Sequence, residues 1–449
     1  MCKEPMNLSM CFVGVIWSIF IILNCVNAFS FDYVLPELGS LSRIFESKVV
    51  LNVKDYGAKG DGILDDTKVF TDVWDIACSS KVKLRIKIPS GCSCLVGPIS
   101  LGGPCNSKVT LEIAGSIIAP SNPDVWNGND TQKWLYFHNV DHLTVKGGGT
   151  INGMGHEWWA TSCKTDPENA LMFHKCNNLV VENLIIMNGQ QCQMTFTTCD
   201  GVKASGLSIS APASSPNTDG IHISESTNVE VKDTTVRTGD DCISIVSNSS
   251  KVTVTRIVCG PGHGISIGSL GESGTCDQVY DVSVREAFLS NTENGLRIKT
   301  WQGGTGFVRN VKYENVWMLN VSHPIIIDQY YCDSSKACPN ETSAVNVENI
   351  SYVNIKGTSA NTEAIRFACS DVSPCEMLYL EDVELVSAQG GTTTSFCWEA
   401  RGSSSGTVNP PLSYSTYASF LKQIISSSSH LISYKRLSLS EFHTVRSVF

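Results

Sequence analysis

From about residue 109 the chain repeats one pattern of polar and apolar positions: a polar residue, typically Asn or Asp, a run of β-branched residues, a turn, and another short run. Consecutive repeats begin 39, 23, 27, 23, 30, 29 and 39 residues apart. The positions that mark them are Asn139-Val140, Asn178-Leu179, Gly201-Val202, Asn228-Val229, Lys251-Val252, Asp281-Val282, Asn310-Val311 and Asn349-Ile350. A strand-built repeat of this length predicts a solenoid, in which each unit buries its apolar face against its neighbours.

No helical periodicity interrupts these runs, so the strands are expected to stack in parallel. The pattern predicts an all-β protein with a single parallel β-helix over residues 49–400. The alternative is a β-sandwich, whose hairpins would show two-residue turns, and such turns are scarce here.

One amphipathic helix is predicted near the beginning of the solenoid. Asp65 and Asp66 are expected to supply its N-cap and a negatively charged first turn. An apolar face then recurs at helical spacing at Val69, Phe70, Val73, Ile76 and Ala77. This short helix is expected to cap the N-terminal end of the sheet stack.

The N-terminus has the form of a secretory signal peptide, residues 1–28. Lys3 precedes the apolar run Met10–Leu23, and the small residues before Ala28 suit signal peptidase. A membrane anchor is the alternative, but about 20 apolar residues are needed to span a bilayer. We therefore expect a secreted, extracellular protein with no membrane segment after the signal is removed.

The cysteines and glycosylation sequons agree with secretion. Removing the signal leaves 16 of the 19 cysteines, an even number that favours disulfides. A structural zinc site would need Cys-x-x-Cys pairs, and Cys92-x-Cys94 lacks that spacing. Predicted glycosylation sites are Asn129, Asn248, Asn320, Asn340 and Asn349.

The amino-acid composition and net charge limit the classes of partner that this protein can bind. A formal net charge of −10, without any basic block, argues against nucleic-acid binding. Charged residues make up only 17% of the chain, and its 36 glycines are typical of a turn-rich soluble protein. A polyanionic substrate remains compatible with this chain only if positive charge is concentrated locally.

Three acids stand in short glycine-containing breaks between strands: Asp219, Asp240 and Asp241. Asp219 precedes Asp241 by 22 residues and Asp240 precedes His263 by 23, each about one coil. Residues in register on neighbouring coils lie about 4.8 Å apart. Such closely spaced carboxylates repel, which drives one of them to keep its proton and favours acid/base chemistry.

Two cations fall on the same face of the predicted solenoid. Arg297 and Lys299 follow the Val282 anchor by 15 and 17 residues, in a coil lengthened by the loop 271–277. Alternate positions of a strand point to the same side. These residues therefore predict a local cationic patch beside the acids of an otherwise acidic protein.

Five segments carry a resemblance to the plant polygalacturonases. They are SPNTDGIHIS (215–224), TGDDCISI (238–245), CGPGHGISIGSLG (259–271), NGLRIKTWQGG (294–304) and PIIIDQYYC (324–332). The resemblance implies a right-handed parallel β-helix that hydrolyses α-1,4 bonds between galacturonic acid units of homogalacturonan. It further implies inversion at the anomeric carbon, no metal or other cofactor, and a monomer in the plant cell wall.

The resemblance also implies a role for each matching residue. Asp240 would protonate the leaving oxygen, while Asp219 and Asp241 would hold and deprotonate the attacking water. His263 would keep the acid in its working protonation state. Further residues would bind the sugar, with Arg297 and Lys299 on its carboxylate and Asn217, Gln329 and Tyr331 around it. The implied disulfides are Cys242–Cys259 and Cys369–Cys375.

The chain departs from the family at its end. Residues 412–449 are Ser-rich, contain no cysteine and show no repeat. We expect an atypical tail that is not a domain and is dispensable for activity. Cys397 is expected to lack a disulfide partner.

Three alternatives to an endo-acting hydrolase stay open from the sequence. The first is an exo-acting polygalacturonase. The second is a β-helix pectate lyase, although the calcium ligands it would need are missing from the sequence pattern. The third is a pectin-binding wall protein without activity, which would be expected to have lost at least one of the three acids.

Overall fold

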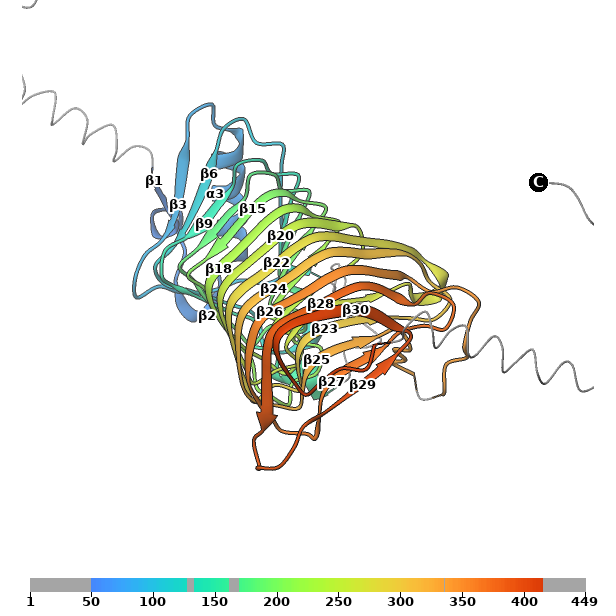
Figure 1. The fold of residues 1–449 in the computed structure, drawn as a ribbon. Helices are drawn as coiled ribbons and strands as arrows, with labels where there is room; N and C mark the ends of the chain where they lie inside the picture. The colour runs from blue at the N-terminus through green and yellow to red at the C-terminus, as the bar shows by residue number, and fades with distance from the viewer. Residues whose placement is uncertain (1–49, 127–132, 161–168, 335, 415–449) are drawn as a thin grey trace, which may run out of the picture. The chain divides into compact units, whose positions relative to one another are not determined.

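The computed structural model describes residues 50–126, 133–160, 169–334 and 336–414. Within the unit that begins at Asn52, the chain winds through successive coils that stack along one axis, as the colour sequence in Figure 1 shows. The predicted signal peptide and the sequon at Asn129 lie outside the described residues. Among the residues described, no helix combines the length and apolar character required to cross a bilayer.

The coils are built from two parallel sheets that run the length of the stack. The larger sheet contains β2 (Asp61–Asp65), β3 (Leu84–Ile88), β4 (Ser93–Leu95), β6 (Val109–Ile113), β7 (Ser116–Ile118), β9 (Thr144–Lys146), β10 (Thr150–Asn152), β12 (Val180–Glu182), β13 (Ile185–Met187), β15 (Asp200–Ser205), β16 (Ser208–Ser210), β18 (Thr227–Arg237), β20 (Ser249–Cys259), β22 (Cys276–Ser290), β24 (Thr305–Val321), β26 (Asn346–Ser359), β28 (Cys375–Ser387) and β30 (Ala400–Asn409). The second sheet contains β5 (Ile99–Gly102), β8 (Lys133–His138), β11 (Asn169–His174), β14 (Met194–Thr197), β17 (Ile221–Ser224), β19 (Ile243–Ile245), β21 (Ile265–Leu270), β23 (Asn294–Thr300), β25 (His323–Asp328), β27 (Glu363–Ala368) and β29 (Thr394–Trp398). The predicted parallel β-helix is confirmed.

The remaining elements are short. The strand β1 (Val50–Asn52) precedes the 3-10 turn η1 (Val53–Tyr56). The helices are α3 (Thr67–Ser79) and α4 (His156–Ala160), with further 3-10 turns at η2 (Pro123–Trp126) and η3 (Glu272–Gly274).

Six of the eight repeat positions found in the sequence lie within strands of the larger sheet, and the other two, Asn139 and Asn178, lie between strands. Each first residue has a left-handed φ, for example 53° at Asn228 and 56° at Asn310, a conformation that Asn, Asp and Gly adopt more readily than other residues. Each following apolar residue is buried, and these residues align between coils, as in Val229↔Val252 and Val252↔Val282. Six of the seven spacings read from the sequence are therefore true coil lengths. The first was wrong, because Thr144 pairs with Val180, 36 residues later, and not 39.

Alternation along the second sheet separates core from surface. Ile221 and Ile223 of β17 are fully buried, whereas His222, between them, faces outward. The inward row continues from coil to coil through Ile243 and Ile265. The outward row of the same coils carries polar residues, so this surface of the second sheet can present chemistry without disturbing the core.

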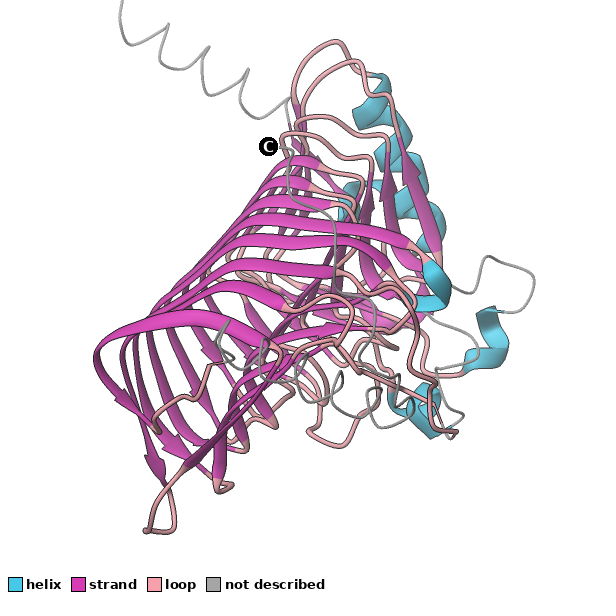
Figure 2. Cartoon of the chain, turned by 45° about the vertical axis from the view of Figure 1, so that its right-hand side comes forward, coloured by secondary structure: helices cyan, strands magenta, loops and turns pink. Residues whose placement is uncertain are grey.

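The predicted helix is confirmed as α3, which lies beside the first coils in Figure 2. Trp74 packs edge-to-face on Phe137 with ring centroids 5.5 Å apart and donates its indole N–H to the carbonyl of Gly102 at 3.0 Å. The buried face of α3 consists of Phe70, Val73, Trp74 and Ala77.

Three details of the helix prediction were wrong. The first turn of α3 contains no acid, because the helix begins at Thr67. Asp66 is the N-cap residue but makes no capping hydrogen bond, since its carboxylate accepts the N–H groups of Lys59 and Gly60 instead. Ile76, placed on the apolar face, is 43% exposed.

The disulfides implied for Cys242–Cys259 and Cys369–Cys375 are both present. The described residues also contain Cys78–Cys105 and Cys332–Cys338, which the sequence left open. Cys397 is unpaired, as expected. The four described sequon asparagines are all exposed: Asn248, Asn320, Asn340 and Asn349.

The last coil ends later than predicted. β30 (Ala400–Asn409) pairs with β28 and continues the solenoid beyond residue 400. Tyr414 then donates its hydroxyl to the carbonyl of Ser403 at 3.2 Å. Most of the Ser-rich tail, residues 415–449, lies outside the described residues.

Candidate active site

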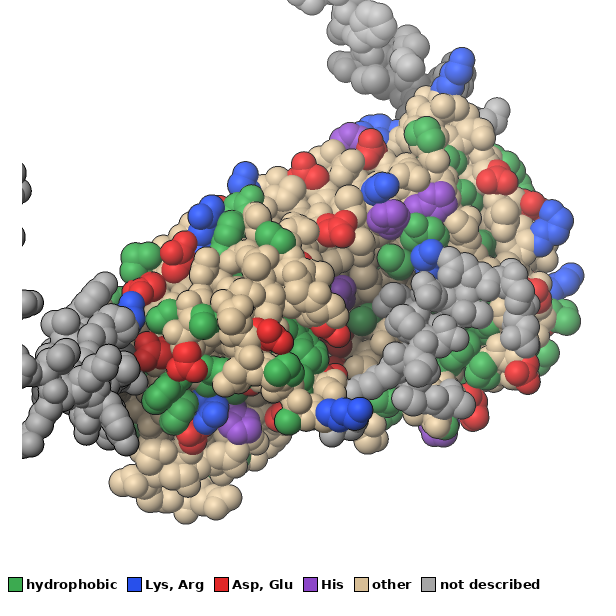
Figure 3. All heavy atoms as spheres, turned by 90° about the vertical axis from the view of Figure 1, so that its right-hand side faces the viewer, with side chains coloured by type: hydrophobic (Ala, Val, Ile, Leu, Met, Phe, Trp, Pro, Cys, Tyr) green, Lys and Arg blue, Asp and Glu red, His purple; other side chains and the backbone are tan. Residues whose placement is uncertain are grey.

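A cavity of about 610 Å³ lies over the outward face of the second sheet, and Figure 3 shows acidic, basic and histidine side chains gathered around a hollow on one face of the molecule. Strands β17, β19, β21 and β23 and the turns between them supply most of its lining. Eight residues proposed from the sequence line it: Asn217, Asp219, Asp240, Asp241, His263, Arg297, Lys299 and Tyr331.

Asp241 is the buried anion of the site, with 1% of its surface exposed. Arg297 Nη2 lies 2.6 Å from its Oδ1 and Lys299 Nζ lies 3.1 Å from its Oδ2. Ser266 Oγ donates to the same Oδ1 at 2.6 Å. Burial alone would raise the pKa of Asp241, but the charges of Arg297 and Lys299 outweigh it and lower that pKa. Asp241 is therefore held in its ionised form.

Asp240 and His263 form a second pair. The two side chains meet at Nδ1 and Oδ1, 2.9 Å apart, and the Asp240 oxygen also accepts the N–H of Asp241 at 2.8 Å. On the other side of the ring, Nε2 lies 3.4 Å from the carboxylate of Glu293. The hydrogen bond to Asp240 raises the pKa of His263, burial opposes it, and the charge of Glu293 adds to the rise. The imidazole is thus clamped between two carboxylates.

Among the described residues, Asp219 has no lysine or arginine contact comparable to those of Asp241. Its Oδ2 accepts the hydroxyl of Ser244 at 2.6 Å and lies 3.8 Å from Nδ1 of His222. Burial raises the pKa of Asp219; the nearby imidazole of His222 opposes this, while the charges of Asp240 and Asp241 add to it. The site therefore shifts the pKa values of two neighbouring carboxylates in opposite directions, so that Asp219 tends to keep its proton and Asp241 to lose it.

Asn217 and Tyr331 complete the lining that the sequence predicted. Asn217 sits in a left-handed turn with φ of 53°, and its side-chain Oδ1 is buried without a hydrogen-bond partner among the described residues. The ring of Tyr331 lies edge-on to Trp301 at 5.4 Å, and Lys299 Nζ is 5.2 Å from its centroid. Both residues are placed to contact a ligand in the cavity.

Residues 78–406 match the model of the family described as glycosyl hydrolases family 28. The chain belongs to this family. It is a glycoside hydrolase, and the polygalacturonase resemblance read from its motifs is confirmed.

Two plant polygalacturonases and one solved structure are similar to this family 28 enzyme over most of its length. A probable polygalacturonase of Arabidopsis thaliana is 54% identical over 411 residues, 89% of this chain and 93% of that one. Polygalacturonase-2 of Solanum lycopersicum is 46% identical over 355 residues, 78% and 77% of the two chains. An exopolygalacturonase structure from Thermotoga maritima superposes with a TM-score of 0.66 at 20% identity, over 77% of this chain and 88% of that one. The enzyme shares with it the right-handed parallel β-helix.

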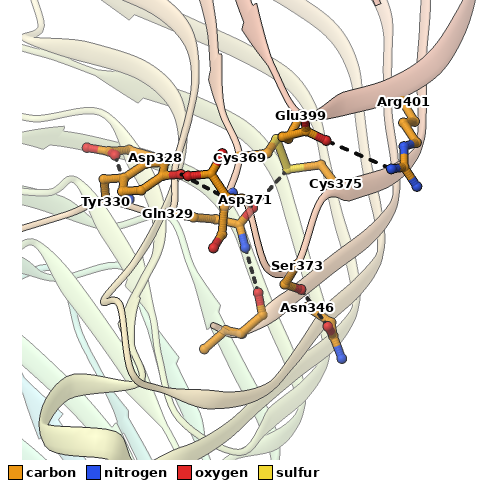
Figure 4. Close-up of a disulfide and its surroundings, with 12 residues drawn as sticks. Asp328, Gln329, Tyr330, Asn346, Cys369, Asp371, Ser373, Cys375, Glu399 and Arg401 are labelled. Carbon is orange, nitrogen blue, oxygen red and sulfur yellow. Dashed lines mark hydrogen bonds and ion pairs between the residues drawn. A yellow bond between two sulfur atoms is a disulfide. The ribbon is translucent and has the colours of Figure 1, made fainter. Parts of the chain in front are cut away.

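The prediction that Gln329 contacts the sugar needs correction. It does not line the cavity and is fully buried, beside the Cys369–Cys375 disulfide in Figure 4. Its Nε2 donates to the carbonyl of Val345 at 2.7 Å, and its Oε1 accepts the N–H of Ser370 at 2.9 Å. Both ends of the amide are committed to backbone groups, so Gln329 ties loops together instead of meeting substrate.

We predict that Gln329→Ala destabilises the family 28 enzyme by about 2–4 kcal/mol, because two buried backbone groups lose their partners. Urea unfolding measures this effect, with KM measured on the same samples. Asn217→Ala is the matched control, expected to raise KM with a smaller effect on unfolding. An unchanged unfolding curve with a raised KM for Gln329→Ala would return this residue to the substrate site.

Among the described residues, four side chains that contact the predicted acids or His263 were not identified from the sequence: His222, Ser244, Ser266 and Glu293. The first three could have been predicted from the alternation of side chains along each strand, which places them on the outward face. They pair in register there as His222↔Ser244 and Ser244↔Ser266. Glu293 carries no such signal. It comes from the turn before β23 and reaches His263 only through the stacking of coils.

The raised pKa of His263 predicts a pH-dependent stability. The ordinary pKa of histidine is about 6.5 in the unfolded chain. A folded-state pKa above that value stabilises the fold fully below about pH 6.5, and the contribution is lost as pH rises through the folded pKa. The stability advantage of the wild type over His263→Asn should therefore shrink over that window, as urea unfolding at a series of pH values would measure.

The matched control for this measurement is His142→Asn. His142 is exposed and has φ of 59°, a conformation that asparagine tolerates. Its pH profile is expected to parallel that of the wild type. Parallel profiles for wild type and His263→Asn would contradict the assigned contact with Asp240.

Proposed function

We propose that this protein is a secreted, monomeric, endo-acting polygalacturonase that hydrolyses α-1,4-galacturonosyl bonds of de-esterified homogalacturonan in the cell wall, with inversion and without a metal cofactor. The observation that carries the proposal is the cavity that combines Asp219, Asp240 and Asp241 with two cations. Carboxylates supply acid and base, and the cations suit a substrate that carries a carboxylate on every ring.

In the proposed reaction, Asp240 donates a proton to the leaving glycosidic oxygen. Asp241, held ionised by Arg297 and Lys299, accepts a proton from the attacking water, which Asp219 helps to hold in place. His263, hydrogen-bonded to Asp240, takes part in setting its protonation between turnovers. A water-mediated attack on the face opposite the leaving group inverts the anomeric carbon.

Binding of the sugar carboxylate is proposed for Arg297 and Lys299. Both line the cavity while they contact Asp241. Lys299 makes one contact with that carboxylate, and an ammonium has three donors, so it can bind a second anion without leaving the first. A methyl ester on the sugar would remove the negative charge that Arg297 and Lys299 are proposed to bind.

Endo action is supported by the length of the hollow. A second cavity of about 350 Å³ shares Asn217, Asp219 and His222 with the first and extends over earlier coils to Met172. Together the cavities follow the second sheet from β11 to β23, and neighbouring strands are about 4.8 Å apart. A groove on both sides of the carboxylates suits internal bonds of a polymer.

The deciding experiment is product analysis on de-esterified homogalacturonan. Nuclear magnetic resonance of fresh product should show inverted configuration, and chromatography should show oligomers of mixed length early in the reaction. Monomer as the sole early product would replace endo with exo action. An unsaturated, ultraviolet-absorbing product would instead identify a lyase, and a retained configuration would overturn the roles of the acids.

A further inference from the structure

Next to the catalytic carboxylates lies a second group of side chains that the proposed hydrolysis does not use as a unit: Cys192, Asp219 and His222. One sulfur, one carboxylate oxygen and one imidazole nitrogen from these residues all lie within 4.8 Å of one another. All three side chains line the cavity of about 350 Å³. The group is therefore reachable from solvent.

Stacking of coils creates this group. The N–H of Gln193 donates to the carbonyl of Asp219 at 2.8 Å, and Met194 pairs with Ile221, so Cys192 stands one coil before Asp219. His222 follows on the outward face of β17. Three residues spread over 31 positions of the chain thus converge without any local metal-binding motif.

The three ligand types are those of zinc. Thiolate, imidazole and carboxylate are its usual protein ligands, and sites of three protein ligands keep a fourth position for water. Oδ2 of Asp219 and Nδ1 of His222 are 3.8 Å apart, near the separation of about 3.4 Å that two ligands of a tetrahedral zinc would have. We propose that Cys192, Asp219 and His222 bind Zn²⁺ and that bound Zn²⁺ inhibits the hydrolase.

Zinc binding at these three residues is inferred from their geometry alone. Inhibition by zinc rests in addition on the proposed role of Asp219 in hydrolysis. Ser244 Oγ now links two of the ligands, at 2.6 Å from Asp219 Oδ2 and 2.8 Å from His222 Nδ1. Zinc would replace this link and the thiol of Cys192 would release its proton to solvent. The metal would then occupy the carboxylate that water activation needs.

A second group, Asp240, Asp241 and His263, has similarly close ligand atoms but is a poorer metal site. Arg297 and Lys299 already contact Asp241, and their charges repel a cation. Among the residues that the structure describes, the lining of the cavity around Cys192 includes no lysine or arginine. The thiol also favours zinc over calcium or magnesium, which bind oxygen ligands.

The test uses the purified full-length enzyme with ZnCl₂ and, for comparison, MgCl₂. Zinc should inhibit wild type reversibly, with recovery on chelation, and magnesium should not. Cys192→Ser should raise the zinc inhibition constant by at least about 10-fold, since weaker support of a metal site already costs that much. Cys276→Ser, which alters an exposed thiol, is the matched control and should leave the constant unchanged.

A second readout needs no substrate. Cobalt(II) added to wild type and to Cys276→Ser should give a thiolate-to-cobalt charge-transfer band in the near ultraviolet, and Cys192→Ser should lack it while keeping the wild-type unfolding curve. Absence of the band in wild type would overturn the site and leave the proposed hydrolysis untouched. The band without zinc inhibition would overturn the inhibitory half and count against the role of Asp219.

Discussion

Asp240→Asn is expected to reduce turnover of de-esterified homogalacturonan by about 10²- to 10⁴-fold, the usual contribution of general acid catalysis. Asparagine keeps the shape of the side chain and its contact with the N–H of Asp241, at 2.8 Å in the wild type, but has no proton to transfer. Binding of an oligogalacturonate should persist, because no cation of the site is touched. Steady-state kinetics and equilibrium binding on the same protein separate the two effects.

Asp219→Asn and Asp241→Asn are the comparisons for this variant. Both should also be severe, since the proposed activation of water uses both carboxylates. Asp241→Asn should in addition lower stability, because Arg297 and Lys299 lose their anion. Near-normal turnover in Asp240→Asn would overturn the assignment of the acid even though the family is established.

Arg297→Met is expected to have the second large effect, on stability and activity together. Arg297 is 8% exposed, and its guanidinium joins Asp241 at 2.6 Å and Ser266 at 2.9 Å. Removing one partner of a buried ion pair costs about 3–5 kcal/mol, and the remaining Lys299 should hold the loss near about 3 kcal/mol. Loss of a charged hydrogen bond to substrate should lower kcat/KM by about 10- to 100-fold.

Two further variants distinguish the ion pair from the substrate contact. Lys299→Met, which removes the longer 3.1 Å contact to Asp241, should destabilise less and appear mainly as a raised KM. In the double variant Asp241→Asn/Arg297→Met, the unfolding cost should be smaller than the sum of the single costs. Strict additivity in urea unfolding would show that the pair does not couple, and unchanged preference between free and methyl-esterified polymer in Lys299→Met would remove it from substrate recognition.

Much of the fold was readable in the sequence because a solenoid repeats one local rule. Asn228 in β18 and Asn310 in β24 adopt a left-handed φ, and the apolar residue after each one belongs to a buried row. Since the rule recurs from coil to coil, spacing alone gave the coil length in six of seven cases; it failed for the first, where Thr144 pairs with Val180. Coil length then placed Asp240 beside His263, which the 2.9 Å contact between them bears out.

The sequence also determined the chemical types of the site's residues, because Asp219 and the pair Asp240-Asp241 stand one coil apart in glycine-containing breaks. It could not decide which groups those acids would contact. Arg297 follows Asp241 by 56 residues and could equally have faced solvent, yet it is buried against that carboxylate. Only the closed stack shows that Asp241 is held ionised by two cations, while no lysine or arginine of the described residues contacts Asp219.

Gln329, Glu293 and Cys192 mark what the tertiary structure alone decided. Gln329 stands in a recognisable motif but turns inward, where the carbonyl of Val345 and the N–H of Ser370 need partners. Glu293 and Cys192 stand in no motif that predicts a site, and the coil adjacent to each places them beside His263 and Asp219. Strand period and turn residues are local properties that a sequence displays, whereas side-chain partners depend on the register between coils and on which buried polar groups remain to be satisfied.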